Sequence, residues 1–375
     1  MPSHGGALQV PKAADNNGTS SFLADRSAKV FLAGHKGMLG TAIHRRLAAL
    51  GFTNIVGRTR AELDLTCEPA VHKFFDAEQP RYVILAAGKV GGLHASSAAP
   101  ADFMTENLRI TMNVLTAARR CGTVRKLLFL ATSAIYPVDA PQPIPESALL
   151  TGPPAPGNEW YVRSSMAEKL ATRACMHVRS QHATRFDKIL RRLYFRYAIP
   201  KIVGIKMCQA YRAELDGMDA IVATPNNLYG PRDPFPSESS HVIPALIRRF
   251  HDAKASGAPE VVVWGSGRQL REFTHADDAA DAVMLLMETY SGPEHVNVGS
   301  GREVTVRELA NTVREVVGYE GRVVWDTSRP DGVMRRLLDS SKMAALGWEP
   351  KVELRDGLKK LYEWYLRGRA TDFEA

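Results

Sequence analysis

Three glycines, Gly34, Gly37 and Gly40, constrain the fold of this chain more than any other feature. They follow the apolar run Lys29–Ala33 and open a stretch over residues 38–50 in which apolar residues recur every three or four positions. That periodicity is typical of an amphipathic helix. A strand, a glycine-rich turn and a helix in this order predict a βαβ unit that binds a dinucleotide.

Each glycine has a separate expected role in this unit. Gly34 permits the tight turn, Gly37 lets the backbone approach the pyrophosphate, and Gly40 lets the helix pack closely on the strand. Met38 and Leu39 then lie at the helix N-terminus, which faces the phosphates. The alternative is an ordinary glycine-rich turn without a ligand. The strand, the spacing and the helix together favour the dinucleotide.

Basic residues near this unit indicate which dinucleotide is bound. NAD-binding enzymes usually carry an acidic residue after the second strand, where it holds the ribose 2′-hydroxyl. This chain has Arg58 and Arg60 there, and Lys36 inside the glycine turn. A cation suits a 2′-phosphate, so we expect NADP(H), with Asp64 close to the adenine. The alternative is that both arginines only solvate a surface loop.

Strand-type runs alternate with helical stretches along much of the chain, which predicts an α/β fold. The implied architecture is a Rossmann-type doubly wound parallel sheet with a smaller C-terminal substrate-binding lobe. Two lobes also suit 375 residues, because single cores stop growing near ~250 to 300 residues. The expected strands lie at 29–33, 54–57, 81–86, 126–131, 220–223 and 261–264, and the expected helices at 38–50, 104–120, 276–290 and 306–317.

Composition divides the chain into three parts. Residues 1–28 are polar and small, so we expect a disordered N-terminal tail. Residues 29–225 form the predicted NADP-binding Rossmann domain, which a basic segment at 161–196 interrupts. Residues 226–375 are assigned mainly to the substrate-binding lobe, with some elements returning to the Rossmann domain.

The net charge of +8 does not indicate a nucleic-acid partner, because its distribution is uneven. Residues 161–196 hold nine Lys and Arg against two acidic residues, and the rest of the chain is nearly neutral. A basic surface over the whole body is the usual footprint of a DNA or RNA binder. The four cysteines lack metal-ligand spacing, so no metal site is expected. Without a bilayer-spanning apolar run or a signal peptide, we expect a cytoplasmic protein with no membrane contact.

A tyrosine and a lysine four residues apart are candidates for the reduction of a carbonyl. On a helix, Tyr197 and Lys201 would share one face. A nearby cation lowers the pKa of a tyrosine that must donate a proton. Thr132 and Ser133 follow the apolar run 126–131, where a hydroxyl can bond a substrate carbonyl. A Tyr-x-x-x-Lys pair alone is common by chance, so the hydroxyls carry part of the argument.

Longer strings extend this pattern over most of the chain. They are VFLAGHKGMLG, GKVGG, PQPIPESALLTGP, EWY, YAIPKIVGIKMCQAYR, PNNLYGPRD, SHVIPALIRRFH, VVVWGSG, REFTHADD and RPDGVMRRLLD. With these strings the chain, from about Val30 to Leu366, resembles the extended short-chain dehydrogenase/reductase family. The similarity is greatest to the members that act on GDP-linked 4-keto-6-deoxy sugars.

The resemblance implies a reaction, a set of residues and an assembly. NADPH would reduce C4 of the sugar, with Tyr197 protonating O4 and Lys201 assisting. Thr132, with Ser133 beside it, would orient the carbonyl. The implied protein is a homodimer that binds a small nucleotide sugar. Contacts with the GDP or the sugar are expected from Asn227, Arg249, Trp264, Arg271 and Arg329.

Relatives also epimerise C3 and C5 of the sugar, with a cysteine and a histidine as acid/base partners. The histidine matches His241. The cysteine matches Ala134, because relatives carry Ser-Ser-Cys-Ile-Tyr-Pro where this chain carries Thr-Ser-Ala-Ile-Tyr-Pro. A methyl group neither accepts nor donates a proton, so we expect epimerisation to be impaired and reduction to survive. Partial substitution by another group or by water is the alternative.

The 36 residues Tyr161–Arg196 interrupt the expected active site. Relatives carry Glu-Trp-Tyr-Ala-Ile-Pro-Lys without a gap, and removing the segment restores that string. Tyr161 is therefore the alternative to Tyr197 as proton donor. Tyr197 is favoured because the lysine follows one helical turn later, provided that the helix starts close to Tyr197 and keeps Pro200 in its first turn. The segment is either translated non-coding sequence or a genuine insertion.

Two other functions fit the same sequence. A related nucleotide-sugar epimerase or dehydratase would hold NAD tightly and leave it unchanged over the whole reaction. A catalytically silent dinucleotide-binding protein would fit Ala134 and the interrupted site. Stoichiometric consumption of NADPH separates a reductase from the first, and binding without turnover defines the second.

Overall fold

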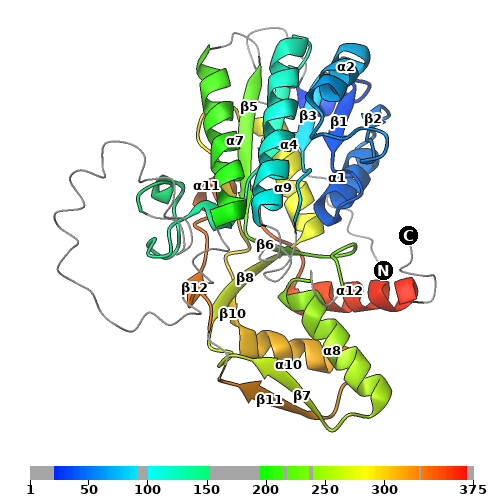
Figure 1. Cartoon of the computed structure of the whole chain (residues 1–375), viewed down its shortest axis with the longest axis vertical. Coiled ribbons are helices and arrows are strands. Elements are labelled where there is room, and N and C mark those ends of the chain that lie inside the picture. Colours follow the sequence, from blue (N-terminus) through cyan, green and yellow to red (C-terminus); the bar gives the residue numbers. More distant parts are fainter. Residues whose placement is uncertain are drawn as a thin grey trace, which may run out of the picture.

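Two lobes make up the part of the chain that the structure, a computed structural model, describes: residues 21–90, 100–152, 195–214, 218–235, 240–328 and 331–369. The upper lobe in Figure 1 holds a six-stranded sheet between helices, and the lower lobe holds shorter strands and further helices. Within these residues, no helix is both long and apolar enough to cross a membrane.

All neighbouring strands of the six-stranded sheet run parallel, in the order β2-β1-β3-β4-β5-β9. Every residue of β1, β3 and β4 is buried, as expected of strands covered on both faces. The chain places β2 on one side of β1 and β3 on the other, so a topological switch point lies beside β1. The strands are β1 (Val30–Ala33), β2 (Ile55–Val56), β3 (Tyr82–Leu85), β4 (Lys126–Leu130), β5 (Asp219–Pro225) and β9 (Val296–Val298).

Helices cover both faces of this sheet, which confirms the predicted doubly wound α/β fold (Figure 1). Alternate residues of β4 serve the two faces: Leu127 and Phe129 belong to one apolar core, and Leu128 belongs to the other. The first face is covered by α2 (Glu68–Glu78), α4 (Pro100–Cys121) and α7 (Phe195–Glu214), and the second by α1 (Met38–Ala49) and α9 (Ala276–Thr289).

The lower lobe has an apolar core of its own, which includes Phe250, Val313 and Leu361. Its central strand β8 pairs with β6, β10 and β12, while β7 pairs with β11. The strands are β6 (Asn227–Tyr229), β7 (Glu260–Trp264), β8 (Leu270–His275), β10 (Glu303–Thr305), β11 (Arg322–Asp326) and β12 (Arg335–Arg336). The helices are α8 (Val242–Ser256), α10 (Val306–Val317) and α12 (Leu354–Arg369), and α11 (Ser341–Ala345) packs near β9.

Regular structure begins closer to the N-terminus than the sequence predicts. Phe22–Ala24 form a short 3₁₀ helix, and Phe22 is only 4% exposed. Its ring stacks on Phe52 at 4.7 Å and meets the edge of Tyr82 at 4.9 Å. Aromatic burial of this kind offsets the entropy of ordering a short segment. The expectation of a disordered tail is therefore wrong for residues 21–28, and residues 1–20 lie outside the described part.

Elements that follow Pro225 return to the upper lobe, because β9 pairs with β5 and α9 covers the sheet. The proposed domain limits remain a prediction. Residues 153–194 lie outside the described part of the chain, and they include most of the interrupting segment 161–196. The backbone of α7 begins at Phe195, which places Pro200 sixth in the helix and not in its first turn. Proline lacks the N–H that would bond the carbonyl of Arg196, so one helical hydrogen bond is missing there.

Candidate active site

The glycine turn after β1 has the geometry that a pyrophosphate requires. Gly34 has a φ of +87°, and a Cβ there would lie 2.7 Å from the amide nitrogen of Ala87. A Cβ on Gly40 would lie 1.9 Å from the carbonyl oxygen of Gly34, so only glycine allows α1 to approach the turn. A Cβ on Gly37 would come no closer than 3.4 Å to the protein. The protein itself therefore does not require glycine at position 37, and the missing Cβ leaves room for a ligand instead.

The N-terminus of α1 is open toward this turn. Gly37 is its N-cap, and no side chain of the described residues caps it. The first amide N–H groups of a helix, here including Met38 and Leu39, lack intrahelical acceptors. They form a site for an anion at the switch point of the sheet. The residues present thus fit the phosphates of a dinucleotide.

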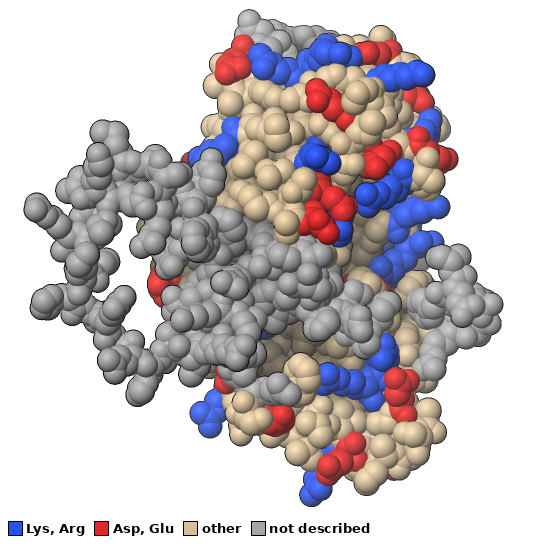
Figure 2. Space-filling model, viewed as in Figure 1, with Lys and Arg blue, Asp and Glu red and all other residues tan. Residues whose placement is uncertain are grey.

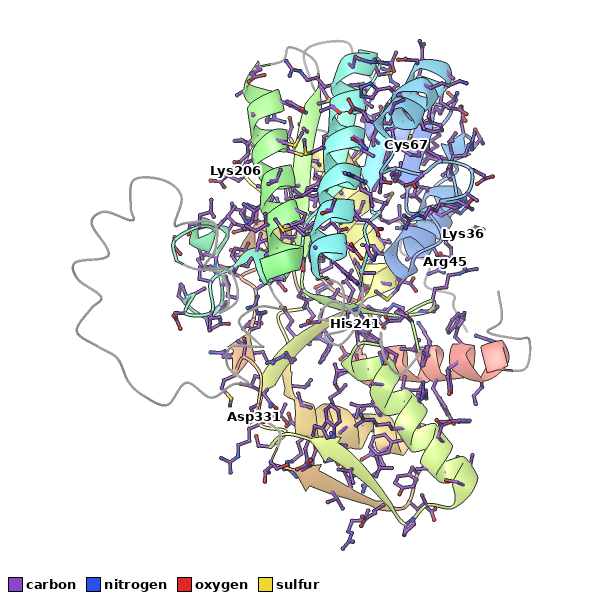
Figure 3. The ribbon with its side chains drawn as sticks, viewed as in Figure 1. Lys36, Arg45, Cys67, Lys206, His241 and Asp331 are labelled. Atoms are coloured by element: carbon purple, nitrogen blue, oxygen red, sulfur yellow. The ribbon has the colours of Figure 1, made fainter. Side chains whose placement is uncertain are left out.

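The basic residues expected at the 2′-phosphate differ in what they contact. Arg58 is half-buried and donates from Nη2 to Oε1 of Glu78 at 2.7 Å and from Nη1 to the carbonyl of Gly57 at 3.0 Å. Lys36 is exposed, and Figure 3 shows it at the edge of the upper lobe. Figure 2 shows Lys and Arg side chains spread along that edge.

Two further predicted residues of this corner are held by hydrogen bonds or ion pairs. Arg60 donates to Oε2 of Glu106 at 3.1 Å. Oδ1 of Asp64 accepts the amide and hydroxyl of Thr66 at 2.9 and 2.8 Å. Those bonds keep the pKa of the Asp64 carboxyl below its usual value, so this residue is ionised at neutral pH.

Lys201 lies buried at the carboxyl end of β4. Its Nζ donates to the carbonyl of Leu130 at 2.8 Å and lies 4.9 Å above the ring of Phe129. Burial lowers the pKa of Lys201 from 10.5 to about 8. Gly204 allows α7, which carries Lys201, to approach β4 this closely, because a Cβ on residue 204 would lie 2.4 Å from the Phe129 ring. The backbone of Tyr197 lies one turn earlier on α7, and its side chain, like all of Tyr161, lies outside the described part.

The turn with the predicted hydroxyls is a short 3₁₀ helix, Ser133–Ile135. Oγ1 of Thr132 accepts the amide of Ala134 at 3.4 Å, which leaves the hydroxyl hydrogen able to donate to a carbonyl. Nη1 of Arg336 donates to the carbonyl of Ser133 at 2.5 Å. Arg336 also lines the candidate site and was not among the predicted site residues, although it lies in the string RPDGVMRRLLD.

A buried network holds the same turn from behind. The hydroxyl of Tyr136 donates to Oδ1 of Asn297 at 2.5 Å and lies 2.8 Å from Nε2 of His295. Burial lowers the pKa of His295 to about 4, so its ring is neutral near pH 7. The amide nitrogen of Asn297 donates on to the carbonyls of Ile144 and Asp339. The turn therefore rests on both the upper lobe and the chain that leads out of β12.

A cavity of about 90 Å³ opens beside the turn. The side chain of Asn227 helps to line it and donates to the carbonyl of Glu272 at 2.9 Å. The neighbouring amide of Asn226 is buried and faces Glu272 without a hydrogen bond of ordinary geometry. Asn226, which directly precedes Asn227, was not among the predicted site residues. The lining residues are Thr132, Ser133, Ala134, Asn226, Asn227, Arg271, Val333 and Arg336.

The chemistry of this lining is clear from its residue types. Two guanidinium groups attract an anion, and two hydroxyls and two amides can bond a sugar. Within the described ranges, none of the lining side chains exchanges protons near neutral pH. The cavity can bind and orient a polar ligand, and it contains no acid or base.

The other predicted site residues that the structure describes do not line this cavity. The guanidinium of Arg249 lies 5.4 Å from the ring centre of Trp264, which is 59% exposed. His241 is the N-cap of α8 and is exposed, although crowding by protein atoms lowers the pKa of its ring. Arg329 lies outside the described residues.

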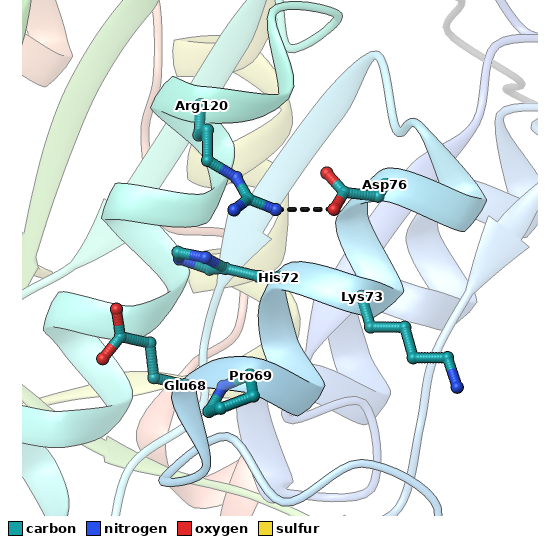
Figure 4. A pocket seen from close by; sticks show the side chains of 6 residues that line it. All are labelled: Glu68, Pro69, His72, Lys73, Asp76 and Arg120. Carbon is teal, nitrogen blue, oxygen red and sulfur yellow. Dashed lines mark hydrogen bonds and ion pairs between the residues drawn. The ribbon is translucent and has the colours of Figure 1, made fainter.

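A larger hollow, of about 450 Å³, lies on the outer side of α2 and α4 (Figure 4). Arg120 and Asp76 form an ion pair across it at 2.5 Å. It is lined by residues of both helices, away from the carboxyl ends of the strands, and contains none of the predicted site residues. The smaller cavity beside Thr132 is therefore the candidate active site.

A switch-point dinucleotide site, a buried lysine and a polar cavity on a doubly wound sheet define a class: a Rossmann-type oxidoreductase or epimerase. The chain belongs to the NAD dependent epimerase/dehydratase family, whose model matches residues 30–185 and 183–299. The two matches meet inside the interrupting segment. This family confirms the resemblance and the fold class predicted from the sequence.

Individual relatives are similar over nearly the whole chain. A putative GDP-L-fucose synthase 2 of Oryza sativa subsp. japonica is 66% identical over 92% of this chain and 89% of its own length. The GDP-L-fucose synthase of Escherichia coli (strain K12) is 44% identical over 91% and 97%. Among solved structures, a GDP-mannoheptose C4 reductase from Campylobacter jejuni with NADP bound is 34% identical. It has a TM-score of 0.73 and covers 91% of this chain and 99% of its own.

Proposed function

We propose that this chain is an NADPH-dependent reductase of GDP-4-keto-6-deoxy-D-mannose in the biosynthesis of GDP-L-fucose. The observation that carries the proposal is the polar cavity that joins Thr132 and Arg271 beside the carboxyl end of β4, where Lys201 is buried. The names of the relatives support the substrate. The NADP-bound relative supports the cofactor.

NADP(H) supplies the hydride when it is bound. The pyrophosphate is proposed to rest on the open N-terminus of α1, and Lys36 and Arg58 are proposed to hold the 2′-phosphate. Asp64 would contact the adenine side of the cofactor, and Lys201 would contact the nicotinamide ribose. The remaining cofactor contacts are assigned to Gly34, Gly37, Met38, Leu39 and Gly40.

Reduction of a carbonyl requires a proton donor and a group that orients the oxygen. Thr132 can donate its hydroxyl hydrogen to the carbonyl, since its oxygen already accepts the amide of Ala134. Lys201 brings a cation into a buried site, where it favours the ionised form of a neighbouring phenol. Tyr197, one turn earlier on α7, is proposed as that phenol and as the proton donor.

Binding of the GDP is assigned mainly to residues of the lower lobe. Arg271 and Asn227 both line the cavity, which supports assigning the sugar and the nearer phosphate to them. Trp264, backed by Arg249, offers an exposed aromatic face to a base. Arg329 is proposed as a further contact.

Epimerisation at C3 and C5 is proposed to be impaired. Ala134 lines the cavity where a proton-exchanging group would be needed, and no other lining residue supplies one. His241, which does not line this cavity, is the remaining predicted acid/base residue, and its lowered pKa keeps the ring neutral. A single base can remove a proton but cannot return one from the opposite face of the sugar.

Incubation with GDP-4-keto-6-deoxy-D-mannose and NADPH tests the whole proposal. We expect NADPH absorbance to fall in proportion to product, for the full chain and for a chain without residues 161–196. Unchanged NADPH with altered sugar would indicate an epimerase or dehydratase, and binding without turnover would indicate a silent protein. In deuterated water without NADPH, Ala134→Cys should accelerate exchange at C3 and C5. Rapid exchange in the unsubstituted chain would overturn the proposed defect.

The assembly and location are proposed as a cytoplasmic homodimer. α4 and α7 lie side by side on the outside of the upper lobe, and Met112 on α4 is 47% exposed there (Figure 1). We propose this helix pair as the surface that meets a second copy of the chain. Sedimentation of the full chain measures the state directly.

A further inference from the structure

His35 lies where the glycine turn meets the end of β2, and the proposed reaction does not use it. Its ring rests on Gly57: a Cβ built there would lie 2.4 Å from Cγ and 2.6 Å from Nδ1 of His35. β1 and β2 are parallel neighbours, with Phe31 opposite Val56, so the turn and the loop leave the same edge of the sheet. Glycine at position 57 is required for the ring to lie here.

The protein leaves one ring nitrogen of His35 without a hydrogen bond among the described residues. Nδ1 is buried and has no hydrogen-bond partner among the described residues. The carbonyl of the same residue accepts the hydroxyl of Thr41 at 3.1 Å, which fixes the backbone of the turn. Buried polar atoms in native proteins are nearly always paired, so an unpaired ring nitrogen in a binding turn indicates that a ligand completes the site.

Charged groups face this ring from three directions. Lys36 is its neighbour in the turn, His44 lies on α1, and Arg58 and Glu62 belong to the loop after β2. Burial and then the charge of Lys36 lower the pKa of His35, with His44 and Arg58 acting in the same direction and Glu62 opposing them. The ring is therefore neutral at pH 7 in the free protein. The cations around it form a corner that an incoming dianion would neutralise.

We propose that His35 is a specificity-determining residue that takes up a proton when a 2′-phosphorylated dinucleotide binds and stays neutral when an unphosphorylated one binds. The inference rests on the proposed NADP(H) function. A neighbouring phosphate dianion favours the protonated imidazole, and histidine is the side chain whose protonation most readily changes near neutral pH. The proton comes from the solvent buffer. Lys36 and Arg58 attract the phosphate at every physiological pH, whereas His35 makes the preference for it depend on pH.

Calorimetric titration of the full chain with NADP⁺ and with NAD⁺ tests this. Binding at pH 7 is measured in two buffers of different ionisation enthalpy, which gives the number of protons taken up. We expect uptake with NADP⁺ and none with NAD⁺. His35→Asn should remove most of the uptake and weaken NADP⁺ binding severalfold at pH 6, with a smaller loss at pH 8.5. His44→Asn makes the same change on the exposed face of α1 and should keep the uptake.

A second variant guards against a folding defect. Gly57→Ala keeps the histidine itself, but the added Cβ would displace the imidazole ring from its position against residue 57. This variant should therefore also lower the proton uptake. With a second pKa of about 6, the 2′-phosphate is already mostly a dianion at pH 7, so its own change in protonation on binding is small and differences between variants report mainly on the protein. Equal uptake in the unsubstituted chain and His35→Asn overturns the inference. Failure to bind NADP⁺ at any pH overturns the proposed function instead, which keeps the two failures distinguishable.

Discussion

Replacing Lys201 by methionine should make the protein more stable and less active. The folded state lowers the pKa of this lysine from 10.5 to about 8 by burial. At about 1.4 kcal/mol per pH unit, keeping the charged form buried costs about 3 kcal/mol. Methionine removes that cost but leaves the carbonyl of Leu130 without its donor, a loss of about 1 kcal/mol. We therefore expect Lys201→Met to raise the free energy of unfolding by about 2 kcal/mol at pH 7.

The pH dependence follows from the direction of the shift. Below pH 8 the lysine is charged in both the folded and the unfolded state, so the full cost is present. Between pH 8 and 10.5 the unfolded state binds more protons, and the stability of the unsubstituted protein rises with pH. The advantage of the methionine variant should therefore shrink over this window and reverse near its upper end.

Urea unfolding at pH 7 and at pH 10, followed by tryptophan fluorescence, measures both effects. Lys206→Met is the matched control, because Lys206 lies on the same helix with an exposed side chain (Figure 3). Its effect should stay within about 0.5 kcal/mol at both pH values. Reductase turnover should fall by roughly 100-fold or more in Lys201→Met only. A methionine variant that is less stable than the parent at pH 7 would refute the reasoning.

Two further sets of variants test the turns that frame the site. Gly40→Ala places a Cβ 1.9 Å from the carbonyl of Gly34 and should cost at least about 2 kcal/mol in thermal unfolding. Gly37→Ala meets the protein only at 3.4 Å, so it should spare stability and lower NADPH affinity at least about tenfold, as fluorescence titration would show. Equal stability losses would contradict the separate roles. Tyr136→Phe leaves Oδ1 of Asn297 without its donor and should cost about 1–3 kcal/mol in urea unfolding. A change below about 0.5 kcal/mol would mean that the buried network does not hold the turn.

Local signals in the sequence account for most of the upper lobe. The alternation of apolar runs and helical periods predicted β1, β3 and β4 to within one or two residues, because a strand covered on both faces must be apolar throughout. The prediction of a helix over 306–317 agrees with α10 in both bounds. The glycine spacing predicted the turn as well, since only glycine tolerates the φ of Gly34 and the contact at Gly40.

Contacts between distant segments required the tertiary structure. The pairing of Arg58 with Glu78, the seat of His35 on Gly57, and the reach of Arg336 to Ser133 each join residues that no local pattern relates. Sequence reasoning named a lysine for catalysis. Only packing against β4 shows that it is buried and that its pKa is lowered.

The sequence by itself therefore determined the kind of fold, because this depends on residue type and on spacing along the chain. It also predicted the place of the dinucleotide from one βαβ unit, and through the family resemblance it predicted impaired proton exchange at Ala134. The tertiary structure decided which polar groups share the cavity and which charges are paired. Burial and hydrogen bonding across elements are properties of the packed chain, and they set the charge state of the groups that a reaction here would use.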